Sequence, residues 1–490
     1  MPLSRAAGHV PALFGPKGYE MKQTPSVGFR YRELAIADEK NLVFGSAPKP
    51  LDCGFGLRIG GGLVFPEVNF TLPAIEVNAS TWSDVLGHYR EIATGVVRRA
   101  VALQVPGIVL EFELLPAMTE TPEWGAEITA LLHACLLEAH EKHGLRSALR
   151  VTPTDIREQA KPPLLRTGPS WERLRRSFEL CVAAGADILS IESIGGKELH
   201  DEGLMYGDFR AIVCALGVLA PRDMAWLWDR IAEACAASPR AIPGGDTACG
   251  FANTAMQLAH QKMLPEVLAA VVRAMSAARS LVAFEHGAQG PSKDCAYEGP
   301  VLKAITGCPI SMEGKSAACA HFSPVGNIAS AMCDLWSNES VQNIRLLSGN
   351  APEAFAELLA YDCRLMNVAT QHGQQNVLRD WLTESDEHLS PQALLLSPAS
   401  TLRIARAIVS VPGDYGRTVA AGREAVALLE QAQASGQCAL PPREKIWLSR
   451  LRAELEDLPA TEDVLLAEMI AQHGTLFDCA SYGLAPHSVG

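Results

Sequence analysis

The stretch that decides the fold runs from Gly244 to Pro300 and contains two turn-like sequences, Gly244-Gly245-Asp246-Thr247-Ala248-Cys249-Gly250 and Gly290-Pro291-Ser292-Lys293-Asp294-Cys295. Between them lie a long helical pattern and the apolar run Leu281-Val282-Ala283-Phe284-Glu285, which predicts a strand. Each turn therefore follows a predicted strand and precedes a predicted helix. In a barrel of alternating strands and helices such turns share one rim, where active sites are built. We expect Cys249 and Cys295 to lie close together on that rim.

Strands and helices also alternate outward from this stretch. Predicted strands lie at 108–113, 148–152, 188–192, 240–243, 280–285 and 309–312, and one more is expected within 51–79. Several strands end in a polar residue: Glu113, Thr152, Glu192, Asp246, Glu285 and Glu313. A doubly wound sheet concentrates its site at one crevice, so polar residues at many strand ends favour a closed barrel. The fold class expected is α/β, a (β/α)8 TIM barrel, and there is no GxGxxG or Walker A sequence to suggest a nucleotide site.

The chain is expected to divide into three parts. Residues 1–50 are rich in Pro, Gly and charge and predict an N-terminal arm with little regular structure. Residues 51–340 form the barrel, and the glycine-broken apolar runs of 51–79 suggest a hairpin over one of its ends. Residues 341–490 show helical apolar spacing separated by Pro-containing breaks, which predicts a C-terminal helical region packed on the barrel.

Composition narrows the functional classes. Of 490 residues, 48% are hydrophobic and 20% charged, which is typical of a folded protein with a sizeable core. Lys+Arg 42 against Asp+Glu 55 gives a net charge of −13, which opposes nucleic-acid binding. The N-terminus has no signal-peptide core, and the sequence predicts no membrane-spanning run. A cytosolic location is therefore expected.

Glu192 lies one strand-to-helix turn upstream of the two cysteines, in Ile188-Leu189-Ser190-Ile191-Glu192-Ser193. Glu192, Cys249 and Cys295 together could bind one zinc ion and leave its fourth position open for water or substrate. The thirteen cysteines include no CxxC pair, so neither a zinc ribbon nor a thioredoxin motif is present. The residues alone leave open that the cysteines are buried, reduced thiols and that Glu192 caps a loop.

Zinc held by two thiolates and one carboxylate is a modest Lewis acid, suited to a neutral alcohol or to a sulfur nucleophile. HExxH, typical of hydrolytic zinc enzymes, is absent. Asp246, three residues before Cys249, is a candidate for handling a proton or orienting a bound alcohol, although such residues more often hold loops in ion pairs. Further polar residues expected on the same rim are Lys293, Asp294, Glu313, Lys315, His321 and Glu339.

Four segments together resemble the methanol:corrinoid methyltransferase family. They are Ser190-Ile191-Glu192-Ser193-Ile194-Gly195-Gly196-Lys197-Glu198, Gly245–Cys249 with Ala252-Asn253-Thr254-Ala255-Met256, Gly290–Cys295, and Met312-Glu313-Gly314-Lys315 with Cys319-Ala320-His321. The resemblance extends from about residue 50 to the end, and these motifs are specific to the family. The N-terminal arm is longer than in the family and carries no family motif.

This resemblance implies a barrel with a helical region and one zinc ion per chain, bound by Glu192, Cys249 and Cys295. It also implies transfer of the methyl group of methanol to the cobalt(I) of a corrinoid that a separate protein carries. That corrinoid protein would dock on the barrel rim and form an oligomer with this chain. Two alternatives stay open: the same chemistry on a methoxylated compound or methylamine, and a non-catalytic barrel that binds a corrinoid protein.

Overall fold

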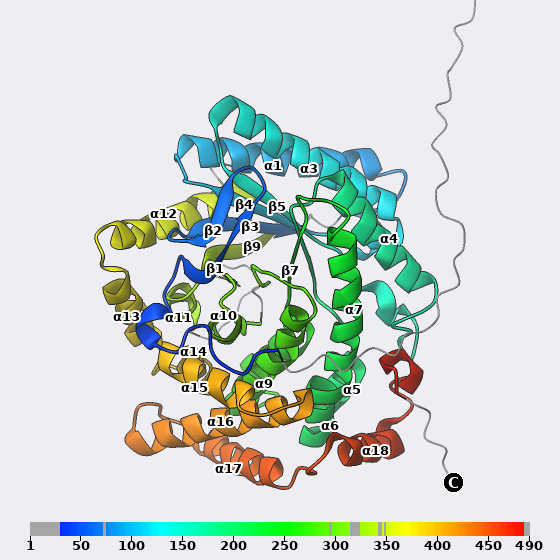
Figure 1. Ribbon diagram of the computed structural model, residues 1–490, viewed down its shortest axis with the longest axis vertical. Coiled ribbons are helices and arrows are strands. Elements are labelled where there is room, and N and C mark those ends of the chain that lie inside the picture. The colour runs from blue at the N-terminus through cyan, green and yellow to red at the C-terminus, as the bar shows by residue number, and fades with distance from the viewer. Residues whose placement is uncertain are drawn as a thin grey trace, which may run out of the picture.

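Parallel strands curl around a common axis and are enclosed by helices (Figure 1). The computed structural model describes residues 30–71, 75–293, 296–313, 324–341, 345–346 and 349–484. Its seven-stranded sheet has the order β7-β6-β5-β4-β3-β9-β8, and every neighbouring pair is parallel. The strands are β3 (Phe65–Thr71), β4 (Ile108–Glu113), β5 (Ser147–Thr152), β6 (Ile188–Ile191), β7 (Ile242–Asp246), β8 (Ser311–Glu313) and β9 (Leu335–Val341).

Residues 289–292 fill the eighth position and close the barrel. On one side, the backbone N–H groups of Gln289 and Gly290 donate to the carbonyls of Pro243 and Gly244 in β7, at 2.8 and 2.7 Å. On the other side, Ser292 forms a parallel bridge with Ile310, immediately before β8. The predicted (β/α)8 barrel is confirmed, and the closing segment leads directly to Lys293 at the rim.

Helices connect the strands around the outside of the barrel. In chain order they are α1 (Trp82–Ala102), α2 (Pro116–Glu120), α3 (Pro122–His143), α4 (Pro169–Ala184), α5 (Lys197–Tyr206), α6 (Phe209–Cys214), α7 (Ala220–Cys235), α8 (Thr254–His260), α9 (Glu266–Glu285), α10 (Gly299–Thr306), α11 (Gly326–Ser330) and α12 (Ala351–Gln371). One-turn π-helical segments, η3 (Ala215–Leu219) and η4 (Cys249–Asn253), precede α7 and α8. α12 packs on β3, β9 and α1, so the last helix of the ring lies beyond the boundary at residue 340 that we predicted for the barrel.

The strand predicted at 280–285 was wrong, and one strand of the barrel was not predicted. Residues 281–285 continue α9, in which every residue from Val267 to Phe284 is buried. This helix is apolar on all sides because the barrel covers one face and α14 and α16 of the C-terminal region cover the other. The missed strand is β9, whose sequence Leu-Trp-Ser-Asn-Glu-Ser-Val carries too many polar residues to match a buried-strand pattern.

Two helical stretches are long and apolar enough to cross a membrane by length and composition: Phe209–Cys235 and α9. We had expected no such run. The first is mostly buried and α9 is entirely buried within the protein, as is typical of core helices.

A β-hairpin covers the end of the barrel at which the strands begin, as predicted for residues 51–79. It consists of β1 (Ser46–Cys53) and β2 (Leu57–Gly61). A separate apolar cluster joins the hairpin to the lowest layer of the lumen; its members are Cys53, Leu57, Ile59, Phe65, Val109, Ala148, Ile188 and Leu335. Gly54, at the hairpin turn, has φ +53°, and a Cβ there would lie 2.1 Å from the carbonyl oxygen of Ser147. The turn therefore requires glycine.

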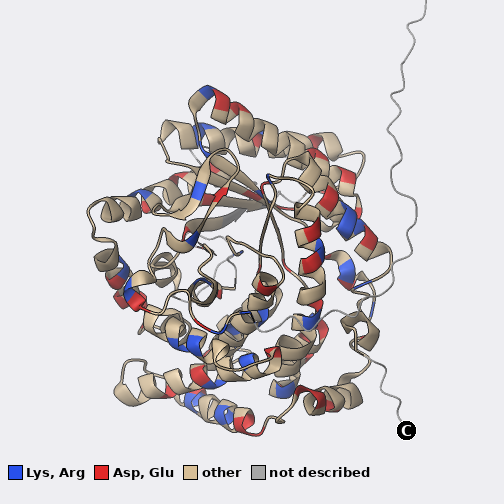
Figure 2. Ribbon diagram, viewed as in Figure 1, with Lys and Arg blue, Asp and Glu red and all other residues tan. Residues whose placement is uncertain are grey.

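The C-terminal helices form an outer layer, whose last three helices are seen in orange and red along the lower edge of Figure 1. The layer consists of α13 (Gln375–Asp386), α14 (Pro391–Leu396), α15 (Pro398–Val409), α16 (Asp414–Ser435), α17 (Pro442–Glu456) and α18 (Glu462–His473). α14, α16 and α17 pack on α9, α15 packs on α10, and α18 packs on α6. Figure 2 shows positive and negative residues interspersed over the outer helices, without a basic patch on the face in view.

Candidate active site

Glu192 and Cys249 lie at the same rim, at the carboxyl ends of two neighbouring strands. Ile191 pairs with Asp246 across β6 and β7, so Glu192 begins one turn and Cys249 lies three residues into the other. The Glu192 side chain is 31% exposed and Cys249 is partly exposed, so both can be reached from the barrel mouth. The Asn253 side-chain amide donates to Cys249 Sγ at 3.3 Å, across the single turn of η4.

Cys295 and Asp294 lie outside the described residues, but the chain on either side of them reaches this rim. Lys293 Nζ lies 3.7 Å from Glu192 Oε1. The backbone N–H of Ala296 donates to Thr247 Oγ1 at 3.2 Å, two residues before Cys249. Residues flanking all three predicted ligands therefore meet within one part of the molecule.

Asp246 is fully buried and binds protein groups on three sides. Its carboxylate accepts hydrogen bonds from the backbone N–H of Ser193 at 3.2 Å and from Trp228 Nε1 at 3.0 Å, and it pairs with Arg279 Nη1 at 3.4 Å. Arg279 in turn donates through Nη2 to the Ser193 carbonyl and hydroxyl at 2.9 and 2.8 Å. These contacts tie the turn after β6 to the turn after β7. The geometry favours a positioning role for Asp246, and our prediction that it handles a proton stays untested.

The lumen beneath the rim contains buried charges. Lys293 is fully buried, and its Nζ contacts Glu113 Oε1 at 2.5 Å and Glu111 Oε1 at 3.0 Å, both on β4. One layer lower, Arg150 Nε pairs with Glu67 Oε1 at 2.7 Å. Burial raises the pKa of the Glu67 carboxyl, although the neighbouring Arg150 opposes this shift.

A second buried carboxylate supports the turn that carries Cys249. Glu298 Oε1 accepts a hydrogen bond from the backbone N–H of Ala248 at 2.7 Å and another from Ser280 Oγ at 2.8 Å. Burial raises the pKa of Glu298. The position of Cys249 is thus fixed from below by α9 and by the residue that precedes α10.

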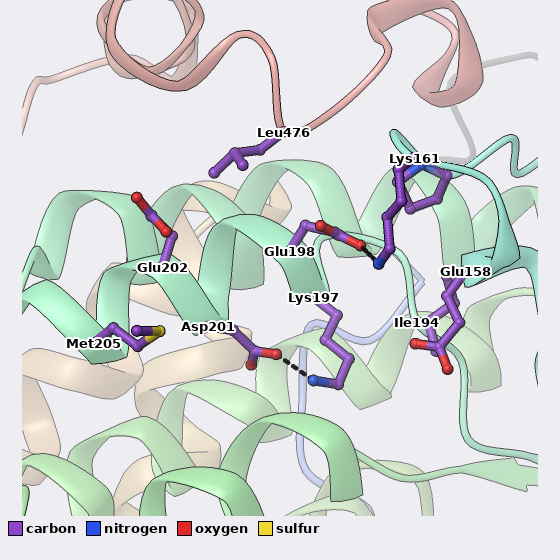
Figure 3. A pocket seen from close by; sticks show the side chains of 10 residues that line it. Glu158, Lys161, Ile194, Lys197, Glu198, Asp201, Glu202, Met205 and Leu476 are labelled. Atoms are coloured by element: carbon purple, nitrogen blue, oxygen red, sulfur yellow. Dashed lines mark hydrogen bonds and ion pairs between the residues drawn. The ribbon is translucent and has the colours of Figure 1, made fainter.

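A pocket of about 370 Å³ lies beside the rim, next to the turn after β6 (Figure 3). Two ion pairs cross it, Lys161 with Glu198 and Lys197 with Asp201. Neither Glu192 nor Cys249 lines it. The pocket nevertheless adjoins the site, because a Cβ at Gly250 would lie 3.2 Å from Lys197 Cε.

The remaining rim predictions have mixed outcomes. Glu113, Thr152 and Glu313 end barrel strands as expected, whereas Glu285 ends α9 and pairs with Arg417 of α16. Lys315 and His321 lie outside the described residues, and the side chain of Glu339 is also outside them.

Comparison with known proteins adds sequence and structural relatives. The family model described as methanol-cobalamin methyltransferase B subunit matches residues 29–483. This chain belongs to that family. It is therefore a member of a methyltransferase family.

Two relatives of this methyltransferase family match over nearly their whole length. The methanol–corrinoid protein co-methyltransferase of Methanosarcina barkeri (strain Fusaro / DSM 804) is 37% identical over 462 residues, which are 93% of this chain and 99% of that protein. The crystal structure of the methanol:cobalamin methyltransferase complex MtaBC from Methanosarcina barkeri matches with a TM-score of 0.89 and 36% identity, again over 93% and 99% of the two chains.

The donor set fits the zinc ion that the family resemblance implies. A carboxylate and thiolates are zinc ligands, and Glu192 and Cys249 present one of each at adjacent turns. No three His, Cys, Asp or Glu side chains are grouped closely enough to hold a metal within the part of the chain that the structure describes. The third predicted ligand, Cys295, is outside that part.

Apart from Glu113 at the end of β4, the charged lumen of this methyltransferase family member was not predicted from the sequence. Glu111, Glu113 and Arg150 alternate with apolar residues along β4 and β5, in Ile-Val-Leu-Glu-Phe-Glu and Ser-Ala-Leu-Arg-Val-Thr. Alternate residues of a strand share one face, so this period of two was the available signal. Arg279 had no such signal, because it lies within the apolar sequence of α9.

Proposed function

We propose that this protein transfers the methyl group of methanol to the cobalt(I) of a corrinoid carried by a separate protein, with the help of one zinc ion. The observation that carries the proposal is the meeting of Glu192 and Cys249 at adjacent strand ends, beside the residues that flank Cys295. Membership of the methanol-cobalamin methyltransferase B subunit family supports methanol as the donor and a corrinoid protein as the partner.

Glu192, Cys249 and Cys295 would hold the zinc ion, which supplies a Lewis acid for the oxygen of methanol. Asn253 donates a hydrogen bond to the Cys249 sulfur and so restricts the direction of that side chain. Asp246 and Arg279 hold the two turns in register, so that the carboxylate and thiol keep a fixed separation. The donors are thus preorganised on rigid strand ends, where a small displacement would be costly.

The reaction balances as a nucleophilic substitution at carbon. Cobalt(I) supplies the electron pair for a new carbon–cobalt bond while the carbon–oxygen bond of methanol breaks. The oxygen leaves with that bonding pair and takes up one proton to become water. Because the carbon must lie in line between cobalt and oxygen, the corrinoid has to cover the barrel mouth, and we propose that its protein docks on this rim.

The test mixes the purified chain with its corrinoid protein reduced to cobalt(I) and follows the cobalt absorbance after methanol is added. We expect methylation with methanol and much slower methylation with ethanol, because an extra methyl group crowds the in-line approach. Glu192→Gln should remove most of the activity and the metal. Glu172→Gln, an exposed carboxylate on α4, should retain both.

If a methoxylated compound or methylamine methylates the cobalt faster than methanol does, that compound is the substrate in place of methanol. No methylation from any donor, with zinc bound and the corrinoid protein docked, would leave a non-catalytic binding barrel and reject the proposal.

A further inference from the structure

Lys293 lies at the meeting point of three carboxylates from two strands of the barrel. Its ammonium contacts Glu113 and Glu111 of β4 at 2.5 and 3.0 Å, and Glu192 at 3.7 Å. The side chain of Lys293 is 0% exposed and that of Glu111 is 1% exposed, so this pair is sealed inside the protein. Glu113 and Glu192 are partly exposed, on the side of the barrel mouth.

The distances from Lys293 Nζ distinguish two carboxylates that hold Lys293, Glu111 and Glu113, from one that Lys293 orients, Glu192. The contacts with Glu111 and Glu113 have hydrogen-bond length, whereas 3.7 Å to Glu192 is a longer, electrostatic approach. A carboxylate has two oxygens and several acceptor sites, so Glu192 can face Lys293 and still bind a metal ion. Lys293 therefore restricts the directions in which Glu192 can point.

The buried charges around Lys293 leave an excess of negative charge that suits a divalent cation. With all six groups counted as ionised, Glu67, Glu111, Glu113 and Glu192 contribute four formal negative charges and Arg150 and Lys293 contribute two positive charges, so that −4 + 2 = −2. Without Lys293 the excess would be −3 and Glu192 would lack its nearest described cation. Lys293 thus limits repulsion among the carboxylates while leaving charge for a metal to neutralise.

Lys293 also anchors the chain next to the third predicted ligand. It follows directly after residues 289–292, which are held between β7 and β8. Ala296, on the other side, is held by Thr247 Oγ1. Lys293 and Ala296 are thus both held at this rim, the first by its side chain and the second by a backbone hydrogen bond.

We propose that Lys293 is a positioning residue of the metal site: its ammonium, held by Glu111 and Glu113 inside the barrel, orients Glu192. This inference rests on the proposed function for the identity of the metal ligands. It assigns Lys293 no contact with substrate.

Zinc affinity, measured by competition with a chromogenic chelator, tests the proposal without methyl transfer. Lys293→Met keeps an unbranched side chain that is one heavy atom shorter and removes its charge, and we expect zinc affinity to fall about 10- to 100-fold, as for other residues that orient a metal ligand. Lys293→Arg keeps the charge and should retain more of the affinity. Cobalt(II) in place of zinc should show altered thiolate and d–d absorption bands in Lys293→Met, because its carboxylate ligand is no longer oriented.

Lys303→Met is the matched control. Lys303 is also fully buried, and it pairs with Asp334 at 3.0 Å at the base of α10, away from the rim. The Lys303→Met substitution should lower the midpoint of urea unfolding. The folded variant should keep the zinc affinity and the cobalt(II) spectrum of the wild type.

Unchanged zinc affinity and an unchanged cobalt(II) spectrum in folded Lys293→Met would overturn the proposal. If Lys293→Met does not fold, Glu113→Gln takes its place, because it weakens the contact that holds the Lys293 ammonium at a partly exposed residue. A fall in the zinc affinity of Glu113→Gln supports the positioning role of Lys293, and an unchanged zinc affinity rejects it. Wild-type protein that binds zinc but does not methylate cobalt would reject the proposed reaction and leave the role of Lys293 standing.

Discussion

Cys249 and Cys181 differ in their exposure to solvent. Cys249 is partly exposed at the rim and accepts a hydrogen bond from Asn253. Cys181 lies fully buried within α4, where burial raises the pKa of its thiol to about 11. A thiol with that pKa stays protonated near neutral pH and does not serve as a metal ligand.

Cys249→Ala should lose most of its zinc, because two protein ligands hold the metal poorly. Cys181→Ala should keep the full zinc content and lose about 1–2 kcal/mol of unfolding free energy through core packing. Metal analysis of the dialysed proteins and urea unfolding measure these two quantities. Stoichiometric zinc in Cys249→Ala and in Cys295→Ala would reject the ligand assignment.

At the scale of elements, α9 shows how packing decides a structure that local sequence leaves ambiguous. Leu281-Val282-Ala283-Phe284 would suit a buried strand equally well, because both faces of α9 are covered and these four residues include no polar one to mark a helical period. β9 is the reverse case: Ser337 lies beside Glu67 on the lumen face and Asn338 is buried on the opposite face, so neither face of this strand shows the usual apolar pattern.

The turns were more predictable than these elements. Glycine and aspartate beside Cys249 indicated a strand-to-helix turn, and Glu192 followed an apolar strand, so both were assigned to the rim correctly. The contact of Lys293 with Glu111 was not predictable, because it joins residues 182 positions apart and exists only in the closed barrel.

Arg417 joins the outer helical layer to α9. Its guanidinium makes a bidentate pair with Glu285, at 2.8 and 2.9 Å, and the two side chains are 1% and 10% exposed. Arg417→Met leaves a largely buried carboxylate without its main partner, so we expect a loss of about 3 kcal/mol of unfolding free energy.

The double variant Arg417→Met/Glu285→Gln should recover part of this loss, since the stranded charge is gone. Urea unfolding of the wild type, the two single variants and the double variant gives the coupling free energy between Arg417 and Glu285. Additive effects would mean that the pair does not hold α16 to α9.

At the scale of the whole molecule, the two ends of the barrel differ: one is closed and the other carries the candidate site. The β1–β2 hairpin seals the end at which the strands begin with an apolar cluster, whereas the rim at the other end carries Glu192 and Cys249. A partner that must reach these two residues can therefore approach from one end only.

Hydrogen exchange should map this asymmetry when the corrinoid protein is added. We expect protection in residues 192–196, in η4 and at Lys293, with no change in the hairpin, because only the rim would be covered. The turn that begins at Gly290 was expected on the rim, but residues 289–292 lie in the barrel wall between β7 and β8 and should change little. Protection restricted to α15–α18, with the rim unchanged, would place the docking surface elsewhere.

The segment that closes the barrel ends where the predicted metal site begins. Residues 289–292 hold β7 and β8 together through backbone hydrogen bonds, and the chain then continues through Lys293 toward Cys295. Any opening of this seam would move Lys293 away from Glu192. A metal bound by all three predicted ligands would act as a cross-link between distant parts of the chain, and the free energy of binding would add directly to that of keeping the barrel shut.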